Sequence, residues 1–182
     1  NYDSSKATKD LRIHRPDVTS IFGAWNPALD KIHSVEGKAQ SGMNWLLTQP
    51  ASFLPQLFTR ALQELRNNEH TKNLRVQIGI PFIGSAKALK KWFFLMGISP
   101  ETHLEAGFLL ESFERAERDG RLTFFADTWT RNCLEWALSL AGGDGVHYMP
   151  HALNERTAWI LIDARGWQHS TGMDILLASK QT

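Results

Sequence analysis

The sequence predicts an α/β fold with three layers, in which a mostly parallel, twisted sheet carries helices on both faces. Two observations lead to this prediction. Segments with helical spacing of apolar residues alternate along the chain with short apolar runs typical of strands. Several of these runs lack the polar alternation of a strand with one solvated face, as is usual in parallel sheets buried on both sides. The intervening helices would supply the crossover connections that parallel strands need.

The predicted helices follow from apolar spacing and from end signals. Residues 22–32 predict a turn that leads into a short helix, with Asn26 as its cap and Pro27 at its first position. Ser85 can cap a later helix, and Gly97 can end it. The longer helices are expected over residues 53–65, 85–97, 109–118 and 129–140.

Short apolar or alternating runs predict the strands, over residues 44–48, 74–80, 122–126, 146–149, 159–163 and 173–178. The last two follow each other without a helix between them, so we expect an antiparallel edge near the C-terminus. Residues 1–20 are polar without a clear period and predict a flexible arm. Residues 21–182 then form a single α/β domain.

The composition is that of an ordinary globular protein. Of the 182 residues, 42% are apolar, and 20 Lys and Arg stand against 19 Asp and Glu. A formal net charge of +1 lacks the basic excess of proteins that coat nucleic acid, so direct nucleic-acid binding is not expected. The single cysteine, Cys133, cannot form an internal disulfide, and no apolar run is long enough to span a membrane. We therefore expect a cytoplasmic protein.

The sequence has no phosphate-binding loop of the usual pattern. The nearest fragment, Gly37-Lys38-Ala39, lacks the hydroxyl residue that follows the lysine in such loops. The loop after the predicted strand 44–48 reads Gln-Pro-Ala-Ser-Phe-Leu-Pro, with neither Gly nor Lys. The Gly-Gly-Asp-Gly run at 142–145 follows a helix, whereas a dinucleotide-binding run follows a strand. We therefore expect no nucleotide hydrolysis and no cofactor.

The sequence predicts neither a catalytic site nor a metal site. His147 and His151 are four residues apart, but Pro150 lies between them, so they do not share a helix face as metal ligands would. Asp127, at the end of the predicted strand 122–126, is the best catalytic candidate, because ligands bind beyond the carboxyl ends of such strands. A capping role is the simpler interpretation of Asp127.

Two groups of residues are candidates for contact with a partner protein. Trp25, Trp129 and Trp167 lie near predicted turns, where exposed aromatic residues often anchor partners. One face of the predicted helix 85–97 is basic, with Lys87, Lys90 and Lys91. A solvated face is the plain interpretation of these lysines, and a surface for an acidic partner is the alternative.

Four segments carry a resemblance to a known family. They are Asn-Pro-Ala-Leu-Asp-Lys-Ile at 26–32, Leu-Arg-Val-Gln-Ile-Gly-Ile-Pro at 74–81, Lys-Trp-Phe-Phe-Leu-Met-Gly-Ile at 91–98, and the stretch 113–149 with its closing Met-Pro. In order and spacing they resemble the SulA-like cell-division inhibitors and, more broadly, the related ImuA-like proteins with a degenerate RecA-like fold. The resemblance covers more than half of the chain. Residues 100–102 read Pro-Glu-Thr where the family carries a lysine.

The resemblance implies a RecA-like sheet without a working nucleotide site and a role in the SOS response to DNA damage. In that role the protein binds the tubulin-like division protein FtsZ and blocks its polymerisation. The resemblance places the partner surface at Arg75, Ile80 and Trp92. With Lys87 and Lys91 of the basic helix face, these are the expected partner-binding residues.

Other functions stay open at this point. An ImuA-like or recombinase-paralogue accessory protein in DNA repair or lesion bypass is the first alternative, and residues 26–32 favour it slightly. A small enzyme acting near Asp127, or a subunit of a larger assembly with Trp25 and Trp167 at the contact, are the others. The sequence also leaves open whether the chain forms a homodimer and what the segment after Pro150 does.

Overall fold

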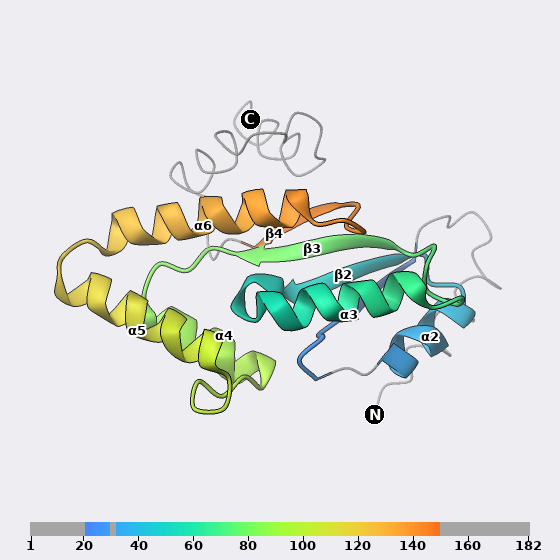
Figure 1. Cartoon of the computed structure of the whole chain (residues 1–182), viewed down its shortest axis with the longest axis horizontal. Coiled ribbons are helices and arrows are strands. Elements are labelled where there is room, and N and C mark those ends of the chain that lie inside the picture. The colour runs from blue at the N-terminus through green and yellow to red at the C-terminus, as the bar shows by residue number, and fades with distance from the viewer. Residues whose placement is uncertain (1–20, 30–31, 150–182) are drawn as a thin grey trace, which may run out of the picture.

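The computed structural model describes residues 21–29 and 32–149, and these form an α/β fold around a parallel sheet (Figure 1). The strands lie in the order β1-β2-β3-β4 and are β1 (Phe22–Trp25), β2 (Trp45–Pro50), β3 (Arg75–Pro81) and β4 (Gly145–Met149). The helices are α2 (Ile32–Gln40), α3 (Pro55–Asn67), α4 (Ala86–Met96), α5 (Leu104–Arg118) and α6 (Leu122–Ser139), with a 3₁₀ turn, η1 (Ala51–Phe53). The predicted α/β class and the parallel pairing of these strands are confirmed.

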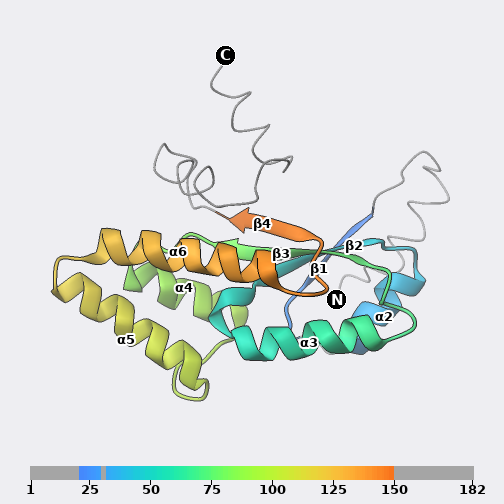
Figure 2. The same ribbon diagram turned by 45° about the horizontal axis from the view of Figure 1, so that its top comes forward.

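The helices that connect neighbouring strands cover one face of the sheet. Because the strand order follows the chain order, right-handed crossovers place successive helices on the same side. The core on this side joins Leu46 and Ile78 of the strands to Val35 of α2, Leu62 of α3 and Leu134 of α6. Figure 2 shows α2 and α3 below the strands, with α6 alongside β3 and below β4.

The opposite face of the sheet carries a different set of side chains. Trp45, Leu47 and Gln77 alternate with the core residues of β2 and β3, are half-buried, and belong to neither hydrophobic core of the described residues. A layer of helices on this face therefore stays a prediction. The predicted strands 159–163 and 173–178, the antiparallel edge and the arm 1–20 lie outside the described residues.

A second core lies beyond the carboxyl edge of the sheet. Figure 1 shows α4 and α5 past the arrowheads of the strands, with α6 running from there back along the sheet. Apolar side chains of these helices and of η1 fill this core, among them Phe53, Leu89, Phe93, Phe113 and Ala126. The long α6 thus spans both cores and holds α4 and α5 against the sheet.

The end signals of α4 act as the sequence predicts. The Ser85 hydroxyl accepts a hydrogen bond from the Ala88 amide at 3.0 Å. At the other end Gly97 takes the left-handed conformation, with φ 65°, in which a side chain would be strained. The predicted helix 85–97 is confirmed, as are helix 53–65 within two residues and the strands 44–48, 74–80 and 146–149.

The prediction of a strand at 122–126 is wrong, because these residues form the first turns of α6. A short apolar run is compatible with either a strand or a helix. The structure buries Ala126 completely and leaves Phe124 75% exposed, which is the division expected of two sides of a helix. The predicted helices 129–140 and 109–118 are confirmed, but each begins earlier, at Leu122 and Leu104.

The prediction of a turn at residues 22–25 is also wrong. They form β1, which pairs in parallel with β2 and brings Trp25 opposite Thr48. Asn26 caps a turn instead of a helix: its side-chain oxygen accepts from the Ala28 amide at 3.0 Å, and α2 begins only at Ile32. A four-residue strand that contains Gly23 has little local signal, and its pairing with β2 defines it.

Candidate functional site

The loop after β2 is filled by aromatic packing. Phe53, at the end of η1, is 1% exposed. Its ring stacks on Trp129 of α6, with centroids 6.2 Å apart, and meets Phe93 of α4 edge-on at 5.3 Å. In P-loop proteins the strand that precedes the nucleotide site is followed by a glycine-rich loop with open backbone amides. Here the loop packs the second core, and Pro55 begins the helix that follows it.

The structure places the predicted partner-binding residues in two separate regions. Arg75 is the exposed first residue of β3, and its guanidinium lies 5.2 Å from the centre of the Trp45 ring. The seven residues of β3 extend about 20 Å, and α4 with its lysines follows the far end. Arg75 therefore lies well away from Lys87 and Lys91.

Two other predicted residues face inward. Ile80 is fully buried in the sheet core, so a partner could touch it only if the sheet opened. Trp92 is half-buried on the flank of α4, where its ring lies 6.5 Å from that of Phe53. Trp92 therefore positions α4 against η1 while part of its ring reaches solvent.

Lys87 and Lys91 are exposed on the outer face of α4. On that face Phe94 is 84% exposed and Leu95 60% exposed. The core residues of the helix (Ala86, Leu89, Phe93 and Met96) point the opposite way. We call Lys87, Lys91, Phe94 and Leu95 the α4 face. It combines two positive charges with two large apolar side chains, and exposed apolar groups gathered on one face are typical of interaction surfaces.

The third lysine of α4 is engaged within the chain. Lys90 lies 2.7 Å from a carboxylate oxygen of Glu114 on α5. The hydrogen bond from Lys90 and its positive charge hold the pKa of Glu114 below its usual value. The first turn of α4 is tied to α5 as well, because the Ala86 amide donates to Glu117 at 2.7 Å. These contacts fix the orientation of the α4 face.

Sequence reasoning found the lysines of the α4 face but missed Phe94 and Leu95. The signal was present, because Leu89, Phe93 and Met96 already complete the core side of this helix. Phe94 and Leu95 fall outside that spacing and therefore point to solvent. A helix with large apolar residues on both sides was a cue for a second contact surface.

A further apolar groove lies between α5, α6 and the start of α3. Its volume is about 290 Å³, and its walls include Phe53, Leu109, Phe125 and Trp129. Phe108 stands at its edge and is 67% exposed. Trp129 was expected near a turn, but it lies within α6 and is half-buried. Its indole packs against both cores.

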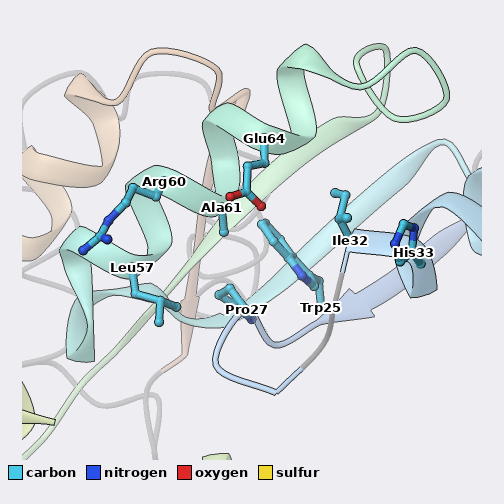
Figure 3. Close-up of a pocket in the computed structure, with 8 residues that line it drawn as sticks. All are labelled: Trp25, Pro27, Ile32, His33, Leu57, Arg60, Ala61 and Glu64. Atoms are coloured by element: carbon cyan, nitrogen blue, oxygen red, sulfur yellow. The ribbon is translucent and has the colours of Figure 1, made fainter.

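A larger depression lies between α2, α3 and the carboxyl end of β1 (Figure 3). Its volume is about 490 Å³, and it is lined by Trp25, Pro27, Ile32, His33, Leu57, Arg60, Ala61 and Glu64. Figure 3 shows Arg60 extending away from the other lining side chains, so its guanidinium and the Glu64 carboxylate do not converge. Trp25 is 2% exposed, which corrects the expectation of an exposed anchor. Trp167 lies outside the described residues.

The structure does not place Asp127, the catalytic candidate from the sequence, at the end of a strand. Asp127 was expected at the end of a strand, but it lies inside α6. Cys133 is buried, and its burial raises the pKa of its thiol to about 12, which opposes formation of a nucleophilic thiolate. His147 is half-buried on β4, and burial lowers its pKa. His151 lies outside the described residues.

The described ranges contain no group of three or more His, Cys, Asp or Glu side chains placed to bind a metal ion. In the same part of the chain, no helix has the length and apolar character needed to cross a membrane. Neither a protein-family model nor a curated protein matches the sequence.

Proposed function

We propose that this chain is a non-catalytic protein-binding domain that binds FtsZ and blocks its polymerisation, as an SOS-type inhibitor of cell division. The observation that carries the protein-binding part is the α4 face. Phe94 is 84% exposed beside Lys87 and Lys91, and its exposure to water costs free energy in the isolated chain that burial against a partner surface would recover. A degenerate RecA-like fold belongs to the same proposal.

The loop after β2 supports a binding role over nucleotide chemistry. A P-loop nucleotide hydrolase needs open backbone amides and a lysine in the loop after a strand, whereas the loop after β2 packs Phe53 against Trp129. The arrangement is instead suited to holding α4, α5 and α6 rigidly at one end of the sheet. A rigid surface binds a partner with a smaller loss of conformational entropy.

The choice of FtsZ rests on the resemblance of four sequence segments to the SulA-like inhibitors. Two of these segments, 74–81 and 91–98, correspond to β3 and to the second half of α4 with its end. The second one contains Phe94 and Leu95 of the α4 face. The proposal therefore moves the contact from Arg75 and Ile80 toward the exposed side of α4.

The test is FtsZ polymerisation followed by light scattering in the presence of GTP, with this protein titrated in. We expect inhibition near equimolar ratio. The variant Phe94→Ser should need at least a tenfold higher concentration for the same inhibition. Phe124→Ser is the matched control, because Phe124 is similarly exposed (75%) but lies on α6, and it should inhibit like the parent protein.

No inhibition at large excess would overturn the FtsZ assignment. The next candidate is the repair or lesion-bypass accessory protein, which a pulldown with a recombinase or a bypass polymerase would test. A DNA gel shift in parallel would show whether the chain itself binds DNA, which its net charge of +1 disfavours.

A further inference from the structure

The two lysines of the α4 face have no ion-pair partner within the described residues. Lys87 and Lys91 lie four positions apart, so their side chains stand about 6 Å apart along the helix axis on the same side. Lys90, between them in sequence, is paired with Glu114. Two ammonium groups held next to each other without a carboxylate create a local positive potential that favours an acidic partner.

Apolar side chains continue the same row of α4. Lys87, Lys91 and Leu95 follow each other at intervals of four, and Phe94 lies one turn beyond Lys91. Side chains at intervals of four form the ridges that pack between the ridges of a second helix. The row thus offers two charged positions and then an apolar end, along about 12 Å of helix.

The start of α4 is not itself an anion site. The Ser85 hydroxyl accepts from the Ala88 amide, and the Glu117 carboxylate accepts from the Ala86 amide. With those amides occupied, the acidic groups of a partner would meet Lys87 and Lys91 and not the helix end. The contacts of Glu114 and Glu117 also hold the row in place before a partner arrives.

We propose that the α4 face binds an acidic amphipathic helix of a partner protein. That helix carries carboxylates at two positions four residues apart, which pair with Lys87 and Lys91. A large apolar side chain one turn further packs on Phe94 and Leu95. The proposal rests on the proposed protein-binding function but does not depend on FtsZ being the partner. Charge complementarity sets the register, and the apolar end supplies most of the affinity.

The probe is a synthetic alanine-based helical peptide with two glutamates four residues apart and a phenylalanine three residues after the second. Binding is measured by NMR, from amide shifts of the isotope-labelled full chain during peptide titration. We expect shifts confined to α4 and the adjoining side of α5. The same peptide with both glutamates replaced by glutamine, or with the phenylalanine replaced by serine, should bind at least tenfold more weakly.

Two variants of this protein test whether the lysines of the α4 face bind the peptide. The double variant Lys87→Glu, Lys91→Glu should raise the dissociation constant of the acidic peptide at least tenfold. Lys72→Glu is the matched control, because Lys72 is an exposed lysine outside α4, and it should leave peptide binding unchanged. Circular dichroism confirms that each variant is folded.

The outcomes separate this proposal from the FtsZ assignment. Peptide shifts away from α4, or binding that tolerates charge reversal at Lys87 and Lys91, would overturn the proposal. Inhibition of FtsZ and binding of the acidic peptide that both tolerate the double variant would overturn the proposal and leave the FtsZ assignment in place. Peptide binding at α4 without an effect on FtsZ would support the surface and reject that partner.

Discussion

The indole of Trp129 stacks on the ring of Phe53, with centroids 6.2 Å apart and an angle of 12° between the ring planes. Phe53 lies in the loop after β2 and Trp129 lies in α6, so the pair joins the sheet to the helices beyond its edge. Trp129 packs against both hydrophobic cores. This contact couples the position of α4, and therefore of the α4 face, to the sheet.

Phe53→Ala should lower the free energy of unfolding by about 3–5 kcal/mol, because it empties a fully buried aromatic site. Urea denaturation followed by far-ultraviolet circular dichroism measures the change. Phe124→Ala is the control: its ring is 75% exposed, and its loss should cost less than about 0.5 kcal/mol. Equal losses for the two variants would contradict the packing described for η1.

Asp144→Ala should destabilise the start of β4. One oxygen of the Asp144 carboxylate accepts from the Arg66 guanidinium and from the Val76 amide, each at 2.8 Å. Removing the carboxylate leaves the Val76 amide without this acceptor. The free energy of unfolding, measured by urea denaturation, should fall by about 1–3 kcal/mol. The control is Asp119→Ala, because Asp119 forms an exposed ion pair with Arg121. This variant should lower the free energy of unfolding by less than about 1 kcal/mol. A smaller loss for Asp144 than for Asp119 would argue against this role.

Cys133 should resist thiol reagents while the chain is folded. Burial raises its thiol pKa to about 12, so at pH 8 almost no thiolate is present, and the side chain is also shielded. We expect modification by an aromatic disulfide reagent to be slow in buffer and complete within minutes in urea. Absorbance of the released thiolate reports both rates. Rapid reaction of the native protein would show that α6 opens readily.

Stability should fall on mild acidification, in part through His147. Burial lowers its pKa below the ordinary value of 6.5, so the unfolded chain binds a proton more readily than the folded one. The contribution of neutral His147 is complete above pH 6.5 and declines as the pH falls from there toward the lower folded-state pKa. Urea midpoints at pH 7.5 and 5.5 measure the change.

His147→Gln is the matched variant for this pH dependence, since glutamine is polar but does not titrate in this range. The decrease in the free energy of unfolding between pH 7.5 and 5.5 should be smaller in the variant than in the parent protein. An identical decrease in both proteins would mean that His147 does not contribute to the pH dependence.

Local signals account for the elements that the sequence predicted well. Pro81 ends β3, Ser85 caps α4 and Gly97 ends it, and each signal acts through neighbouring backbone atoms. The spacing of Phe58, Leu62 and Leu65 identifies α3 because those side chains share one helix face. The basic side of α4 could be predicted for the same reason.

The sequence by itself determined the α/β class, the parallel strands around 44–48, 74–80 and 146–149, and the lysines of the α4 face. Tertiary structure decided whether 122–126 is strand or helix, that 22–25 pairs with β2, and that Trp25 is buried while Phe94 is exposed. The physical reason is that an apolar residue gains the same transfer free energy in any core. The packing of the neighbouring helices and strands therefore determines which apolar side chains are buried in a core.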